Sequence, residues 1–223
     1  MALIIEILLG LGFAAAVGGV VHVWRARMET ERLDALQALA ARRGWALTLT
    51  GERLGRAGTL RLAPRGGNPW VAEARPAGAG PGAPATLYEA GAPRWAEGTL
   101  VLVARPQGAP EAMRAPGPDR GAVLARQLGP DLAGLPASLR PVEAGPGLVA
   151  LADADPSRRA PLEDLGRLLG AWRPVVRGER GRPVLILSPE GMQVRLGHAI
   201  GHAGPMERFV DLCLDLSRTL GPD

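Results

Sequence analysis

Hydrophobic residues fill the first part of the chain almost without interruption. Residues 2–24 contain one acidic side chain, Glu6, and one histidine, but neither Lys nor Arg. As a helix this segment would be about 34 Å long, enough for a hydrocarbon core about 30 Å thick. The pattern predicts a transmembrane anchor over residues 1–24, with Trp24 at the membrane interface.

A cleaved signal peptide is the main alternative for this segment. Such a peptide has a positive N-terminal region and a shorter apolar run before its cleavage site. No Lys or Arg precedes Arg25, and the apolar run continues past Ala14 to Val21, so we expect the anchor to be retained. Because Arg25, Arg27 and Arg32 flank its C-terminal end, we expect a single-pass protein of the cell inner (plasma) membrane. The N-terminus would then lie outside and the C-terminal domain in the cytoplasm.

A stripe of small residues marks one face of this predicted membrane helix. Gly10, Ala14 and Gly18 follow one another at a spacing of four, which allows a second helix to approach closely. Together with Glu6 they form the predicted membrane-helix association site, for a protein partner or for a second copy of the chain. The alternative is chance, because the chain has 31 glycines and is also rich in alanine.

Residues 25–44 continue the helical pattern with a different composition. Leu33, Leu36, Leu39 and Ala40 recur at helical spacing among charged residues, and Gly44 follows as a stop signal. We therefore expect a juxtamembrane helix, continuous with the anchor, that docks on the domain as a stalk.

After Gly44 the hydrophobic period changes from 3.6 to 2, which begins a domain over residues 45–223. Apolar and polar positions alternate in five short segments separated by Gly- and Pro-rich turns. They predict five strands in an antiparallel meander. These strands are residues 45–50, 59–62, 70–75, 85–90 and 98–104.

The second half of the domain predicts both helices and strands. A hairpin turns at Pro189-Glu190-Gly191, and Cys213 falls on the apolar stripe of the last helix, where we interpret it as a core residue. The fold class is α+β, with a mainly antiparallel sheet and helices on one face. The expected elements are helices over 119–128, 156–172 and 205–220, a strand over 147–152 and a hairpin over 184–196.

Composition excludes several classes of enzyme. All 26 basic residues counted as Lys or Arg are arginine, so the lysine that P-loop NTPases, protein kinases and Schiff-base enzymes need is missing. A single cysteine allows neither an internal disulfide nor a multi-cysteine zinc site. A net charge of +4 is only mildly basic.

Two constellations could carry metal chemistry. Asp153 and Asp155 follow an apolar strand, which over these few residues resembles the haloacid-dehalogenase phosphotransferases. The lysine of that family is missing and no βα repeat follows, so we interpret Asp155 as a helix cap. His198 and His202 are four apart, but the surrounding glycines predict a loop and no third ligand is near.

Two further candidates have ordinary explanations. Ser188 lacks the flanking glycines of a nucleophile elbow and lies in a predicted hairpin turn. Arg177, Arg180 and Arg182 could contact phosphate. The chain, however, has too few aromatic residues to form a stacking platform for nucleic acid. We expect no catalytic residues, no metal, no cofactor and no nucleic-acid partner.

The expected function is therefore that of a non-enzymatic, membrane-anchored protein. Its cytoplasmic domain would bind another protein, as an accessory subunit or assembly factor of an inner-membrane complex. Two alternatives stay open: a metal-assisted hydrolase that uses Asp153, Asp155 or the histidine pair, and a module that binds anionic lipid or nucleic acid.

Overall fold

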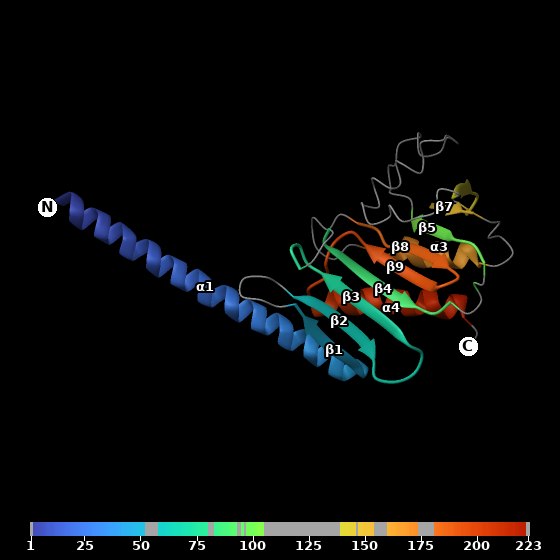
Figure 1. Cartoon of the computed structure of the whole chain (residues 1–223), viewed down its shortest axis with the longest axis horizontal. Coiled ribbons are helices and arrows are strands. Elements are labelled where there is room, and N and C mark those ends of the chain that lie inside the picture. The colour runs from blue at the N-terminus through green and yellow to red at the C-terminus, as the bar shows by residue number, and fades with distance from the viewer. Residues whose placement is uncertain are drawn as a thin grey trace.

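A long helix leads into a single antiparallel sheet with helices packed on one face (Figure 1). The computed structural model describes residues 2–51, 58–79, 83–92, 95, 97–104, 139–145, 147–153, 160–173 and 181–221, without the side chains of residues 2–16 and of Arg25. The helices are α1 (Ala2–Arg43), α3 (Leu162–Ala171) and α4 (Ala203–Leu220). The strands are β1 (Trp45–Thr50), β2 (Thr59–Pro64), β3 (Trp70–Arg75), β4 (Ala85–Ala90), β5 (Leu100–Ala104), β6 (Arg140–Val142), β7 (Leu148–Ala152), β8 (Val184–Ser188) and β9 (Gly191–Leu196).

Helix α1 contains both the predicted anchor segment and the predicted juxtamembrane helix in one element. It runs for 42 residues without a break. Gly44 ends it in a left-handed backbone conformation, with φ of 69°, which glycine adopts without steric strain. The chain then turns directly into β1, so α1 and β1 lie side by side and run in opposite directions (Figure 1).

In the part of the chain that the structure describes, the sheet has nine strands in the order β1-β2-β3-β4-β9-β8-β5-β7-β6, and neighbouring strands are antiparallel throughout. The predicted five-stranded meander is therefore wrong at its last step. Strands β1 to β4 form a meander, but the C-terminal hairpin β8–β9 lies between β4 and β5. The first four residues of β8 are all buried, and a buried strand needs a partner strand on each side to satisfy its backbone N–H and C=O groups.

Side chains alternate between the two faces of the sheet, and those of the described residues form two buried clusters. The larger cluster joins the helix-covered face to the last turns of α1, to α3 and to α4. The smaller cluster lies on the opposite face, on the adjacent strands β8, β5 and β7. It consists of Val101, Val103, Leu151, Val184 and Ile186. The prediction of an α+β fold with helices on one face is confirmed for the domain.

Helix α4 supplies the apolar stripe that the sequence predicts. The predicted core position of Cys213 is confirmed, because its side chain is fully buried. Helix α3 begins at Leu162, later than predicted, and residues 154–159 before it lie outside the described residues, as does the predicted helix over 119–128. The buried stripe of α4 is Met206, Phe209, Val210, Cys213, Leu216 and Leu220.

Candidate functional site

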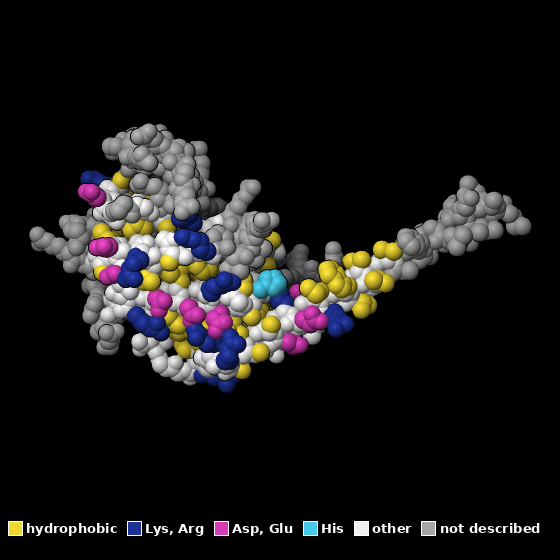
Figure 2. All heavy atoms as spheres, turned by 180° about the vertical axis from the view of Figure 1, so that it is seen from behind, with side chains coloured by type: hydrophobic (Ala, Val, Ile, Leu, Met, Phe, Trp, Pro, Cys, Tyr) yellow, Lys and Arg dark blue, Asp and Glu magenta, His cyan; other side chains and the backbone are white. Residues whose placement is uncertain are grey.

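The projecting part of α1 carries the most exposed large hydrophobic side chains of the described residues. Figure 2 shows hydrophobic side chains along this part of the helix, beyond the charged side chains nearer the domain. Val20 is 70% exposed, Val23 67% and Trp24 61%. Val21 and Val23, two positions apart, point to nearly opposite sides of the helix. Apolar side chains therefore face outward on more than one side, in contrast to the single stripe of an amphipathic helix.

The predicted association site lies mostly outside the described side chains. Nothing is described of the side chains of Glu6 and Ala14, or of the surroundings of Gly10. Gly18 is exposed, and a Cβ added to it would meet no atom within 4 Å. Among the residues that the structure describes, no helix has both the length and the apolar character needed to cross a membrane.

The base of α1 is attached to the domain by packing. Leu36, Leu39 and Ala40 are buried in the larger cluster, as their spacing predicts. The Arg43 guanidinium lies 5.1 Å from the centroid of the Trp45 ring, an arrangement that favours a cation–π interaction. Trp45 in turn meets Trp70 edge-on, with ring centroids 5.4 Å apart.

Ion pairs with α4 reinforce this attachment. Arg42 bonds Glu207 at 3.0 Å, and Arg43 lies 3.7 Å from Glu207 and forms a second ion pair with Asp211. These pairs are partly exposed, so each contributes little by itself. Together with the buried leucines they hold α1 in one orientation relative to the sheet.

The histidine pair does not assemble a metal site within the described residues. The segment between β9 and α4 is a loop, as the glycines predict. Thr86 of β4 anchors it: its hydroxyl donates to the carbonyl of His198 and accepts from the N–H of Ile200, both at 2.8 Å. His202 precedes α4 as its N-terminal flanking residue. No group of three His, Cys, Asp or Glu side chains is close enough to share a metal among the residues described.

The carboxylate of Asp153 has a structural contact. It accepts a hydrogen bond of 2.7 Å from the N–H of Thr99, where β5 begins, and its own N–H donates to the Thr99 carbonyl. This contact joins β7 to β5 at the end of their ladder. Asp155, Arg177 and Arg180 lie outside the described residues.

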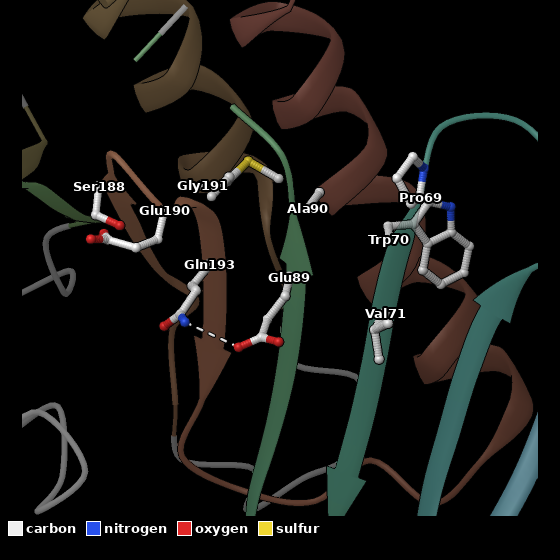
Figure 3. Close-up of a pocket in the computed structure, with 10 residues that line it drawn as sticks. Pro69, Trp70, Val71, Glu89, Ala90, Ser188, Glu190, Gly191 and Gln193 are labelled. Atoms are coloured by element: carbon white, nitrogen blue, oxygen red, sulfur yellow. Dashed lines mark hydrogen bonds between the residues drawn. The ribbon is translucent and has the colours of Figure 1, made fainter. Parts of the chain in front are cut away.

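A shallow pocket of about 400 Å³ lies where the ends of β3, β4 and the β8–β9 hairpin meet. Figure 3 shows Glu89 and Gln193 directed toward each other, with a hydrogen bond of 3.0 Å, and Ser188 beside Glu190. The pKa of the Glu190 carboxyl is lowered, mainly by a hydrogen bond from the Ser188 hydroxyl and to a smaller extent by one from the backbone of Glu190. The lining residues are Pro69, Trp70, Val71, Glu89, Ala90, Ser188, Glu190, Gly191, Met192 and Gln193.

Sequence reasoning missed this pocket, because it joins segments about 100 residues apart that share no motif. Its lining contains no histidine, so Ser188 has no imidazole base there. The carboxylate of Glu89 and the hydroxyl of Ser188 already have partners within the wall. The pocket therefore offers a surface of mixed polarity for binding, without a histidine to activate Ser188.

Comparison with known proteins gives no relative: no family model, curated protein or solved structure matches the chain significantly.

Proposed function

We propose that this chain is a membrane-anchored protein whose cytoplasmic domain binds another protein, as an accessory subunit or assembly factor of an inner-membrane complex. The observation that carries the proposal is the exposure of Val20, Val21 and Val23 on several sides of a helix that projects from the domain. Burying one such side chain is worth roughly 1.5 kcal/mol or more, so an apolar surrounding favours this segment by several kcal/mol. The wholly apolar run of residues 7–21 in the sequence extends the same character toward the N-terminus.

The charge distribution along α1 supports the same proposal. Beyond Trp24 the helix becomes polar, with Arg27, Glu29 and Glu31 exposed. Trp at the end of an apolar run, followed by arginines, is typical of the cytoplasmic interface of a membrane helix. The firm attachment of α1 to α4 then keeps the domain at one distance and one orientation from the membrane. A fixed orientation suits a subunit that presents a surface to a partner.

Membrane attachment is tested by fractionation of cells that express the full chain. We expect the wild-type protein in the membrane pellet after an alkaline carbonate wash. Val17→Asp with Val20→Asp introduces two charges that cost up to about 3 kcal/mol each inside a bilayer, and should move the protein to the supernatant. The matched control is Ala38→Asp with Ala41→Asp, at exposed positions of α1 beside the domain. Wild-type protein in the carbonate supernatant would overturn the proposal.

Partner binding is tested by purification of the tagged full chain in mild detergent. A stoichiometric membrane partner or a defined homo-oligomer is expected. Replacing Gly10, Ala14 and Gly18 together by Leu should abolish that association, because the added bulk keeps two helices apart. Val20→Leu with Val23→Leu adds bulk elsewhere on the helix and serves as the control. Association that survives the triple replacement contradicts the role of the small-residue stripe.

A further inference from the structure

The two edges of the sheet differ in how well they are protected against pairing. At one edge β6 has only three residues, and two of them are Arg140 and Pro141. A short strand with a charge and a proline discourages the addition of another strand. At the other edge β1 has six residues, Trp-Ala-Leu-Thr-Leu-Thr, with no charge and no proline. Such an edge is a template for a further strand.

The hydrogen-bond register shows which groups of β1 face outward. The N–H of Arg65 donates to the carbonyl of Gly44 at 3.1 Å, which makes this pair the hydrogen-bonded continuation of the β1–β2 ladder. Hydrogen-bonded pairs alternate along an antiparallel ladder. Every second residue of β1 therefore bonds β2, and the residues between them direct N–H and C=O away from it. The outward set is Trp45, Leu47 and Leu49, and Pro64, which has no N–H, lies opposite Trp45.

We propose that the outer edge of β1, with which no described strand pairs, binds an extended segment of a partner protein, which adds to the sheet as a further strand antiparallel to β1. Main-chain bonds to Leu47 and Leu49 supply affinity, and alternate side chains supply specificity. Side chains of the segment on the helix-covered face lie beside Leu47 and Leu49 and are apolar. Those on the opposite face lie beside Thr48, which is exposed, and are polar.

A second copy of the chain is a less suitable occupant than a partner segment. If β1 paired antiparallel with β1 of a second copy, a two-fold axis perpendicular to the sheet would relate the two molecules. Helix α1 runs opposite to β1 and beside it (Figure 1), so the two α1 helices would point in opposite directions. They could not enter one membrane from the same side. The choice of a partner segment over a second copy therefore rests on the proposed function, since it assumes that α1 is anchored in a membrane.

The charge near the first residue of β1 indicates which type of residue the partner segment carries at that end. Arg42 and Arg43 pair with Glu207 and Asp211. Arg65, whose backbone N–H bonds the carbonyl of Gly44 next to Trp45, adds a third positive charge and leaves this end of the edge net positive. In an antiparallel pairing the C-terminal end of the incoming segment lies at this position, so an acidic residue there is favoured. The charged residues are Arg42, Arg43, Arg65, Glu207 and Asp211.

The test uses amide hydrogen exchange on the full chain in lipid nanodiscs. The probe is the synthetic peptide acetyl-Ser-Val-Thr-Val-Ser-Val-Asp-amide. In the free protein we expect fast exchange at Leu47 and Leu49 and slow exchange at Ala46 and Thr48, which bond β2. Saturating peptide should slow exchange at Leu47 and Leu49 at least tenfold and leave Ala46 and Thr48 unchanged. No added protection at Leu47 and Leu49 would overturn the proposal.

A pair of variants separates the backbone contact from side-chain packing. Leu47→Pro removes an outward N–H without touching the β2 ladder and should weaken peptide binding at least tenfold. Leu47→Ala loses the same packing but keeps the N–H, and should bind within about threefold of wild type. Equal binding by both variants would overturn the proposal. Protection of Leu47 and Leu49 that rises with protein concentration in the absence of peptide would overturn it in favour of a second copy. The fractionation test does not depend on these results, so failure of the β1 edge and failure of membrane anchoring are distinguishable.

Discussion

The Nη2 atom of Arg42 donates to both carboxylate oxygens of Glu207, at 3.0 Å each, although the two residues are 165 positions apart in the sequence. Arg42 lies in the last turn of α1, and Glu207 lies in the second turn of α4. The ion pair therefore joins the projecting helix to the last element of the chain. A partner bound to α1 is therefore linked to the domain through the contact between α1 and α4.

A double-mutant cycle measures how much this ion pair contributes. Arg42→Ala, Glu207→Ala and the double variant should give a coupling energy of about 0.5–1 kcal/mol, because the side chains are 65% and 28% exposed and water screens the pair. The measurement is the free energy of unfolding in urea. The more exposed pair Arg27–Glu31, within α1, should give a smaller coupling energy. A coupling energy below that of Arg27–Glu31 would show that this ion pair does not help to hold α1 against α4.

Packing of Leu36 should contribute more than the ion pair. Its side chain is fully buried between α1 and the sheet, so Leu36→Ala should lower the free energy of unfolding by about 2–5 kcal/mol. The matched control is Val23→Ala, on the projecting part of the same helix, which should change it by less than about 0.5 kcal/mol in detergent. Urea unfolding followed by tryptophan fluorescence gives both values. Similar losses for the two variants would contradict the docked position of α1.

The hydroxyl of Thr86 should determine the stability of the 197–202 loop. Thr86→Val keeps the shape but leaves the N–H of Ile200 without its acceptor, at a cost of about 1–3 kcal/mol. Amide exchange at Ile200 should become correspondingly faster. Thr86→Ser retains the hydroxyl and should preserve slow exchange. An Ile200 amide that exchanges equally slowly in Thr86→Val would show that the hydroxyl does not anchor this loop.

Two glycines of α3 should respond in opposite ways to the same substitution. A Cβ on Gly166 would lie 2.5 Å from a methyl carbon of Leu148, whereas one on Gly170 would meet nothing within 4 Å. Gly170→Ala should stabilise the domain by up to about 1 kcal/mol through helix propensity. Gly166→Ala should destabilise it, since Leu148 is buried and must shift. The measurement is the Tm of each variant in thermal unfolding. Equal shifts in Tm for the two variants would contradict the close approach of α3 to β7.

The Cys213 thiol should be unreactive in the folded protein. Burial raises its pKa well above the ordinary value of 9.0, so it stays protonated while the unfolded chain ionises near that value. The free energy of unfolding should therefore be unaffected by this group below pH 9 and should fall as the pH rises above it. Cys213→Ala should make this alkaline decline less steep. Iodoacetamide should modify the wild-type thiol only in urea, and rapid modification without urea would contradict its burial.

Most elements of the domain follow from local patterns. The stripe from Met206 to Leu220, the hairpin at Pro189-Glu190-Gly191 and the stop at Gly44 each depend on residues within a few positions of one another. Periodicity and turn chemistry therefore predict them. The docking face of α1, with Leu36 and Leu39, is predictable for the same reason.

Strand order and the contacts between distant segments depended on the tertiary structure. A backbone ladder is chemically the same for any pair of strands, so the alternation in β5 is equally compatible with β4 or with β8 as a neighbour. Only the packing of the whole core places the β8–β9 hairpin between β4 and β5. The pocket beside Glu89, the ion pairs of Arg42 and Arg43 and the open edge of β1 all follow from that arrangement. The sequence by itself determined the elements and the apolar N-terminal run, because these are local. The tertiary structure decided which elements meet, because long-range pairing leaves no periodic signal in the chain.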